Sequence, residues 1–360
     1  MISIVVLSYV TIGLKSTKVI HIPKGTTSYI ISYLDKRGFE MNFLDKVIIV
    51  ALGFPQSGWI DLKAHQMSKA DFLYKLTTSK AALKTITLIP GETYPFFLKQ
   101  LSSKLNLSFN KLHHTYNRLK IKEDGNIIAE TYHLPYGMDE EHLIFYLMNY
   151  SSNIYKKFSQ KIFGEYNQES WYRYITIASI IQKEAASNDE MSLVSSVVHN
   201  RLKKNMKLQM DGTLNYGIYS HDKVTSKMIK TNTSDYNTYK KRGLPSNPVC
   251  AVGFDAIKAA LFPSKTNYLY FTKNYESGDH IFTDSYKKHR NNTKTSVKYK
   301  RLAEKKARAK QKEKSILKNV KNKQKEKSKS AKTKTTQEVS IFTKDTKEKK
   351  SIKDIWESIK

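Results

Sequence analysis

The sequence predicts an α+β part followed by a mixed α/β domain and a disordered basic tail. Two segments, at 22–34 and 89–101, each read as a strand joined to a helix. Two later stretches, at 171–186 and 193–202, carry apolar residues at helical spacing. From residue 294 onward the chain has no glycine or proline and few large apolar residues, which is typical of a solvated low-complexity segment.

Composition limits the class of protein. The 360 residues are 39% hydrophobic, which is enough to bury a core, so the chain is not disordered throughout. Its single cysteine, Cys250, excludes an intrachain disulfide and any metal site built from several cysteines.

The first fourteen residues carry no charged side chain and are dominated by isoleucine, valine and leucine. The stretch is shorter than the roughly 20 residues that span a bilayer, and it lacks the basic start of a signal peptide. Three interpretations stay open: a membrane anchor whose start is clipped or misassigned, a short uncleaved signal-like anchor, or a buried strand. An anchor over residues 1–18 is favoured.

A repeated pattern follows this segment. Strands would end at Ile22 and at Ile89, each of which precedes a proline. Thr26 and Thr93 would then cap the two helices that follow, because a threonine hydroxyl can accept a hydrogen bond from a free N–H of the first turn. Two related small α+β units are therefore expected.

The helix predicted over Trp171–Ala186 places a carboxylate on its apolar face. At 100° per residue, Glu184 lies within about 60° of Ile177 and Ile181. A partly buried carboxyl has a raised pKa and can stay protonated near neutral pH, as a general acid requires. The alternative is that the helix frays here and that Glu184 is solvated.

Two further features follow this helix. Ser187 and Glu190 fit a capping box for a second helix that extends through Leu202. The loops beyond it are rich in tyrosine, asparagine, threonine and glycine. Such loops suit sugar recognition, because aromatic faces stack on sugar rings and amides bind hydroxyl groups.

The tail holds most of the excess charge. Residues 294–360 contain 24 of the 62 basic and 8 of the 32 acidic residues, which is a net charge of +16 out of +30. One interpretation is electrostatic attachment to lipid head groups, nucleic acid or an acidic wall polymer. The alternative is a solubilising tail.

Several motifs occur in a fixed order along the second half of the chain. They are Ala178-Ser179-Ile180-Ile181-Gln182-Lys183-Glu184, Asn200-Arg201-Leu202, Leu208-Gln209-x-Asp211-x-Thr213-x-x-Tyr216-Gly217, Tyr236-Asn237-Thr238-Tyr239, Gly243-Leu244-Pro245 and Gly278-x-His280-x-Phe282. Together they resemble the endolytic murein transglycosylase family, the YceG-like proteins. The likeness covers about residues 20–290 and leaves out the tail.

The resemblance implies a lytic transglycosylase that cleaves the MurNAc–GlcNAc bond within nascent peptidoglycan strands and so terminates glycan elongation. It implies an anchor at 1–18, a LysM-like peptidoglycan-binding region at 19–150 and a catalytic domain at 151–293, before the tail at 294–360. The enzyme would cross the cell inner membrane once, with its catalytic domain on the periplasmic side. Peptidoglycan strands would be its substrate, and peptidoglycan synthases are candidate partners.

The same resemblance assigns site residues. The family's catalytic glutamate corresponds to Glu184. Candidates for substrate binding are Gln209, Tyr236, Asn237, Asp211, Asn200, Tyr216 and His280, with Asp211 expected mainly to hold a loop. The chain departs from the family at two positions: Gln182 replaces a usual glutamate, and Gly212 replaces a usual proline, which is expected to loosen a turn.

One carboxyl is enough for the lytic reaction. Protonated Glu184 would donate to the oxygen between MurNAc and GlcNAc. The carboxylate would then accept the proton of the MurNAc 6-hydroxyl as this closes onto C1, leaving a 1,6-anhydro-MurNAc end. A group that acts as acid and then as base works best with a pKa near the operating pH. No cofactor is expected.

Rival functions differ in what they require. A hydrolytic muramidase would need a second carboxylate, for which Asp211 and Asp235 are the candidates. A non-catalytic peptidoglycan-binding protein would not need Glu184. Charge alone argues for nucleic acid, and without a recognition motif no specific nucleic-acid partner is expected. No metal is expected either, because the adjacent His113 and His114 cannot face one ion from a helix.

Overall fold

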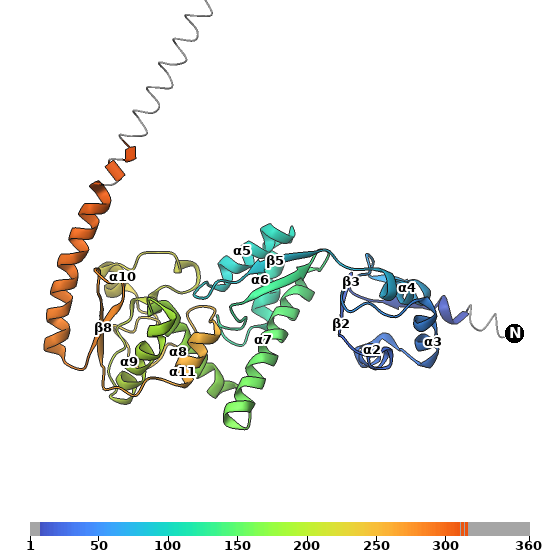
Figure 1. The fold of residues 1–360 in the computed structure, drawn as a ribbon, viewed down its shortest axis with the longest axis horizontal. Coiled ribbons are helices and arrows are strands. Elements are labelled where there is room, and N and C mark those ends of the chain that lie inside the picture. The colour runs from blue at the N-terminus through green and yellow to red at the C-terminus, as the bar shows by residue number, and fades with distance from the viewer. Residues whose placement is uncertain (1–7, 310, 313, 316–360) are drawn as a thin grey trace, which may run out of the picture. The chain divides into compact units, whose positions relative to one another are not determined.

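The computed structural model describes residues 8–309, 311–312 and 314–315 (Figure 1). Each of the four sheets found in these residues has two strands, and helices make up most of the remaining regular structure. The fold is therefore mixed α+β and mostly helical. Contacts divide the chain into one unit of residues up to 271 with 279–289, and a second of residues 272–278 with those from 290 onward.

The N-terminal part contains two antiparallel sheets and three α-helices around one core. The sheets pair β1 (Gly13–Lys15) with β4 (Gln66–Ser68), and β2 (Val19–Ile22) with β3 (Gly58–Asp61). The helical segments are α2 (Thr27–Leu34), the π-helical turn η1 (Asp35–Phe39), α3 (Phe43–Leu52) and α4 (Lys69–Thr78). Thr26 caps α2 as predicted, since its hydroxyl accepts from the Tyr29 N–H at 3.3 Å.

The segment expected to be a membrane anchor is described only in part. Residues 1–7 lie outside the described residues, and residues 13–15 form β1. None of the helices that the structure describes is both long and apolar enough to cross a membrane.

The middle part packs three helices against one antiparallel sheet. Its elements are β5 (Leu83–Thr87), α5 (Tyr94–Leu105), α6 (Phe109–Leu119), β6 (Thr131–Pro135) and α7 (Glu140–Phe163). The expected domain boundary at residue 150 falls inside α7. The predicted side-chain cap of α5 is wrong: Thr93 precedes this helix but makes no capping bond, because its hydroxyl instead donates to the Gly217 carbonyl at 2.7 Å.

The next part is built around α8. Its elements are α8 (Gln168–Glu184), the 3₁₀ turn η2 (Asn188–Glu190), α9 (Met191–Lys203), the 3₁₀ turns η3 (Asp211–Leu214) and η4 (Gly217–Tyr219), α10 (Ser226–Thr231) and α11 (Phe254–Leu261). Nine side chains between Trp171 and Ile181 are buried, and the seven apolar ones join α9 and α11 in one core. Both helices predicted here are confirmed.

The predicted capping box between these helices is wrong. Ser187 makes no side-chain capping bond, and Glu190 accepts instead from the Ala186 N–H at 3.3 Å. The same carboxylate also binds His280, at 2.8 Å from Nδ1 and 2.5 Å from the backbone N. A partner 90 residues later in the chain therefore replaces the local cap.

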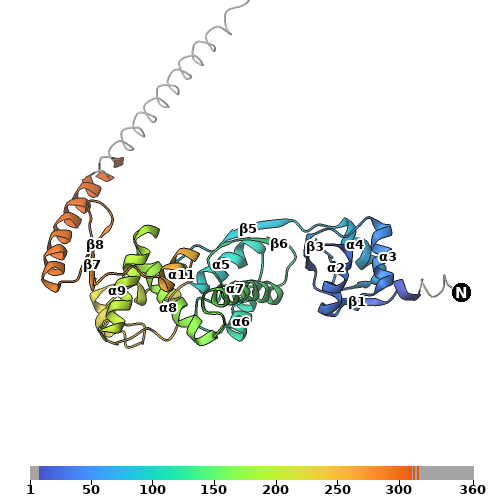
Figure 2. The same ribbon diagram turned by 60° about the horizontal axis from the view of Figure 1, so that its bottom comes forward.

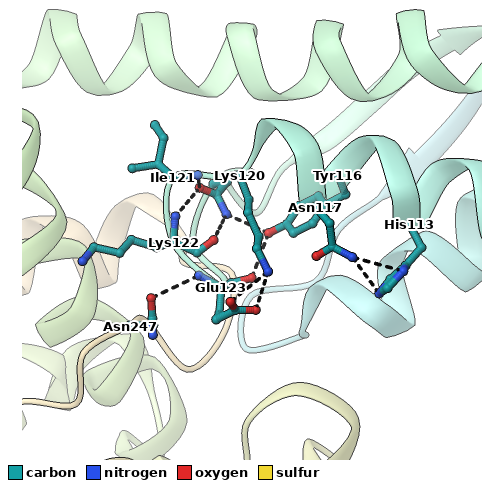
Figure 3. A network of polar contacts seen from close by, with 9 residues as sticks. His113, Tyr116, Asn117, Lys120, Ile121, Lys122, Glu123 and Asn247 are labelled. Carbon is teal, nitrogen blue, oxygen red and sulfur yellow. Dashed lines mark hydrogen bonds and ion pairs between the residues drawn. The ribbon is translucent and has the colours of Figure 1, made fainter.

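A buried amide organises the loop after α6. Asn126 Oδ1 accepts from the backbone N–H groups of Ile121 and Lys122, at 3.0 and 3.2 Å. The neighbouring Glu123 N–H donates to Asn247 Oδ1 at 3.2 Å, as Figure 3 shows. This loop is therefore joined to a segment more than 120 residues away in the sequence.

The segment after Asn247 runs along the buried side of α8. The Val249 N–H donates to Ser179 Oγ at 3.0 Å, and the Gly253 N–H donates to Gln182 Oε1 at 3.2 Å. Cys250 lies between them, fully buried, with its thiol donating to the Ser179 carbonyl at 3.4 Å. These contacts fix the C-terminal half of α8 from behind.

The last described elements are a small sheet and a long helix (Figures 1 and 2). The sheet pairs β7 (Tyr270–Lys273) with β8 (His280–Thr283). Residues 286–309 are helical, so the expected start of the tail at 294 falls inside a helix. Residues 316–360, which make up most of the expected tail, lie outside the described residues.

Candidate functional site

Glu184 is the last residue of α8, and the chain turns away from the helix directly after it. Ala185 is extended, with φ −69° and ψ 136°, and its N–H closes the last helical hydrogen bond to the Ile181 carbonyl. The Glu184 carboxyl is half-buried, and its Oε1 accepts from the Gly212 N–H at 2.6 Å. The carboxyl group is thus held between the helix end and the turn η3.

Gly212 allows this close approach because it has no side chain. A Cβ atom at this position would lie 2.5 Å from the Lys183 Cβ and 2.9 Å from Glu184 Oε1. Contacts of that length do not occur between relaxed atoms, so any larger residue would push η3 away from α8.

The surroundings of Glu184 favour its protonated form. The net effect raises the pKa of the Glu184 carboxyl from 4.5 to about 7: burial is the largest cause, and the negative charge of Asp211 acts in the same direction. The Gly212 N–H and the Arg201 guanidinium oppose this, because both stabilise the carboxylate. The group can therefore exchange a proton close to neutral pH.

This raised pKa makes a prediction for stability. The folded state binds more protons than the unfolded state between about pH 4.5 and 7, so stability falls as pH rises through that range. Glu184→Gln removes the cost of burying the charged form. We expect urea unfolding to show the variant more stable than the parent at pH 8, by up to about 3 kcal/mol, and no such gain at pH 4. An equal shift at both pH values would contradict the prediction.

Asp211 and Tyr239 form a pair beside Glu184. The Tyr239 hydroxyl donates to Asp211 Oδ1 at 2.6 Å, and burial together with this bond raises the pKa of Tyr239. Asn237 is fully buried and accepts from the Tyr239 N–H at 3.2 Å, while its amide nitrogen donates to two carbonyls of the chain around α10. Asn237 therefore supports the loop that carries Tyr239.

Gln209 and Arg201 lie on the other side of the same turn. Arg201 is 7% exposed and donates to the carbonyls of Leu208 and Leu269, each at 2.6 Å. Its Nη1 also lies 3.4 Å from Gln209 Oε1. Gln209 is exposed. Its backbone has a positive φ of 52°, which is a strained conformation for a residue with a side chain.

Tyr216 and Tyr236 stack on each other. Their ring centroids are 4.0 Å apart with an interplanar angle of 7°, and the pair packs on Val249 and Cys250. The two rings therefore pack the segment that follows η3 against Val249 and Cys250.

The segment of residues 211–221, which contains η3 and η4, is attached at several points. Lys183 Nζ donates to Ser220 Oγ at 2.8 Å, and His221 Nε2 lies 2.9 Å from Glu92 Oε2. The bond from Thr93 to the Gly217 carbonyl adds a third attachment. The segment therefore bridges α8 and the start of α5.

Two other candidate residues, Asn200 and His280, bind groups other than those around Glu184. Asn200 donates from its amide to the carbonyls of Thr266 and Tyr268, at 2.8 and 2.9 Å. His280 is held by Glu190, as described above. The structure thus brings Glu184, Asp211 and Gln209 together around η3, and uses Asn200 and His280 to fix neighbouring segments.

Three residues at this site were not among the sequence candidates: Arg201, Gly212 and Tyr239. Each lies inside one of the motifs, one or two positions from a residue that was chosen. Nothing in single-sequence spacing distinguishes them, because their roles depend on contacts between separate loops. Among the described residues, no group of three or more His, Cys, Asp or Glu side chains is placed to hold a metal ion.

Comparison with known proteins adds independent findings. The YceG-like family matches residues 20–295. The endolytic murein transglycosylase of Bacillus subtilis (strain 168) is 40% identical over 124 residues, 34% of either chain. Those of two Streptococcus pneumoniae strains are 30% identical over 131 residues, 34% of this chain and 23% of theirs. The chain thus matches about a third or less of the length of these relatives.

A solved structure is also similar. The crystal structure of a YceG-like protein from Listeria monocytogenes aligns with a TM-score of 0.50 and 23% identity. The alignment covers 77% of this chain and 99% of that one, which shows a shared fold.

Proposed function

The chain belongs to the YceG-like family, and from this premise we propose that it is an endolytic lytic transglycosylase of peptidoglycan, a lyase with Glu184 as its one catalytic carboxyl. The observation that carries the proposal is the half-buried Glu184, with its pKa raised to about 7 and one backbone donor fixing its position. Such a carboxyl can be an acid in one step and a base in the next.

In the first step, protonated Glu184 donates to the glycosidic oxygen between MurNAc and GlcNAc. The bond from that oxygen to MurNAc C1 then breaks, and an oxocarbenium-like centre forms. Burial favours this step because it keeps the carboxyl protonated near neutral pH.

In the second step, the Glu184 carboxylate accepts the proton of the MurNAc 6-hydroxyl as its oxygen bonds to C1. The Gly212 N–H, at 2.6 Å from Oε1, stabilises the carboxylate between the two steps. The carboxyl is protonated again at the end, and the product carries a 1,6-anhydro-MurNAc end.

The two rival carboxylates each accept a short hydrogen bond from the protein. Asp211 accepts from the Tyr239 hydroxyl at 2.6 Å, and Asp235 accepts from the Ser246 N–H at 2.6 Å. Each of these contacts holds one carboxylate oxygen in a bond to the protein, which supports the lytic over the hydrolytic reaction.

Product analysis tests the proposal. The full chain is incubated with uncrosslinked glycan strands, and the fragments are analysed by mass spectrometry. Internal fragments that end in anhydro-MurNAc are expected. Reducing ends would instead indicate a hydrolase, and intact strands would argue for a binding protein.

Asp211→Asn gives a sharper test of the rival. Asparagine keeps an acceptor for Tyr239 but removes the negative charge that raises the pKa of Glu184. The pKa of Glu184 should therefore fall, and the alkaline limb of the pH–rate profile should move to lower pH. The maximal rate should change by less than about tenfold, whereas loss of a hydrolytic base would cost about 100-fold or more at every pH.

We further propose the cellular setting that the family resemblance implies. The start of the expected anchor at 1–18 would hold the chain in the cell inner membrane by a single pass, with the catalytic part on the periplasmic side, and residues 13–15, which form β1, would lie outside the membrane. Residues 19–150 would bind peptidoglycan, and peptidoglycan synthases would be partners whose glycan elongation the enzyme terminates. Protease protection in spheroplasts tests this topology: cleavage of the catalytic part by external protease supports it, and full protection contradicts it.

A further inference from the structure

The helix over residues 286–309 carries a row of basic side chains along one face. The row consists of Arg290, Lys294, Lys298, Arg301, Lys305 and Arg308, spaced by three or four residues, and Lys287 in the first helical turn falls on the same face. At 100° per residue all six fall within an arc of about 80°, and at 1.5 Å per residue the row is roughly 27 Å long. All six residues are exposed. We call this surface the basic row.

The opposite side of the helix is attached to the hairpin segment of the same unit. Ser296 Oγ donates to the Lys273 carbonyl at 2.5 Å, and the hydroxyls of Thr293 and Thr272 are 3.3 Å apart. Lys300 Nζ lies 5.7 Å from the centre of the Tyr275 ring. These anchoring positions lie roughly 120° around the helix from the basic row. The attachment therefore leaves the row facing away from the hairpin.

Like charges three or four residues apart on a helix repel each other, and a bound anion would relieve this repulsion. The only acidic residue among 286–309 is Glu304, which lies outside the arc of the row. No ion pair is found for the six side chains among the described residues. The charges recur about every 5 Å along a line, which matches a linear polyanion.

Resting on the proposed function, which puts this helix beside the cell wall, we propose that the basic row binds a linear phosphodiester polymer of the wall. A membrane surface fits less well, because only Val297 and Leu302 border the row and no apolar face accompanies it. Nucleic acid fits less well too, because no aromatic residue lies on the row to stack on bases.

The test uses the full chain and unbranched poly(glycerol phosphate) of defined length. The row variant combines R290Q, K294Q, R301Q and K305Q. A control of equal charge combines K157Q, K161Q, K288Q and K306Q, all at exposed positions off the row. Each phosphate contact adds about 0.7 to the slope of log affinity against log salt, so the row variant should lose about 3 from that slope and bind about tenfold or more weakly. The control should bind nearly as the parent does.

Two results would overturn the inference. One is an equal loss of affinity in the row variant and the control. The other is row-dependent binding that is tighter to phosphatidylglycerol vesicles or to oligothymidylate than to poly(glycerol phosphate). Cleavage of purified glycan strands free of phosphate polymer should be the same in the parent and the row variant. Since that assay depends on Glu184 and not on the row, failure of the proposed function and failure of this inference give different results.

Discussion

Glu184→Gln is expected to lower strand cleavage by roughly 100- to 10,000-fold, the usual contribution of a general acid–base group. Glutamine keeps the shape of the side chain and an oxygen that can accept from the Gly212 N–H at 2.6 Å. Its amide protons are not acidic enough to be transferred to the glycosidic oxygen, and the neutral amide is too weak a base to take one from the 6-hydroxyl. The change should therefore act on the maximal rate while strand binding persists, which single-turnover kinetics and a binding assay would separate.

The parent's pH profile completes this prediction. The acid step needs protonated Glu184, so the rate should fall as pH rises above the pKa of about 7. Full activity in the glutamine variant, or a parent rate that is flat across this range, would exclude Glu184 as the catalytic acid.

Gly212→Ala is expected to have the second-largest effect. The new Cβ would lie 2.5 Å from the Lys183 Cβ, so η3 must move and the bond from the residue 212 N–H to Glu184 must lengthen. A misplacement of about 1 Å in such a site can cost about 100-fold in rate. The pKa of Glu184 should also rise, because a donor to the carboxylate is lost.

Gly13→Ala is the matched control for this variant. A Cβ atom at Gly13 would meet only the Gln66 side chain, at 3.9 Å, which is an ordinary contact. We expect no change in rate for it. If Gly212→Ala lowers the rate no more than Gly13→Ala does, the contact between η3 and α8 does not position the carboxyl.

The parts of the site that sequence reasoning predicted are the local ones. The helix that carries Glu184, and the burial of its face, follow from side-chain spacing within seventeen residues. The donor to Glu184 comes from Gly212, 28 residues later, and spacing along one helix contains no information about it. The position of Gly212 became interpretable only when the approach of η3 was known.

The two predicted helix caps that are wrong also show that local sequence does not predict contacts between distant segments. Thr93 and Glu190 each have the right residue type at the right distance from a helix start. Each binds a distant partner instead, Gly217 and His280 respectively. A capping bond stabilises a helix by about 1 kcal/mol, so a charged or better-aligned tertiary contact can displace it.

The buried Cys250 thiol makes it possible to measure how often the structure around it opens locally. Its thiol lies fully buried against the Ser179 carbonyl, and burial raises the pKa of the Cys250 thiol, so alkylating reagents cannot reach a thiolate in the closed form. Because the chain contains a single cysteine, every modified molecule reports opening at this one place behind α8. The labelling rate therefore measures how often the support of the Glu184 helix loosens, and whether a bound glycan strand slows that motion.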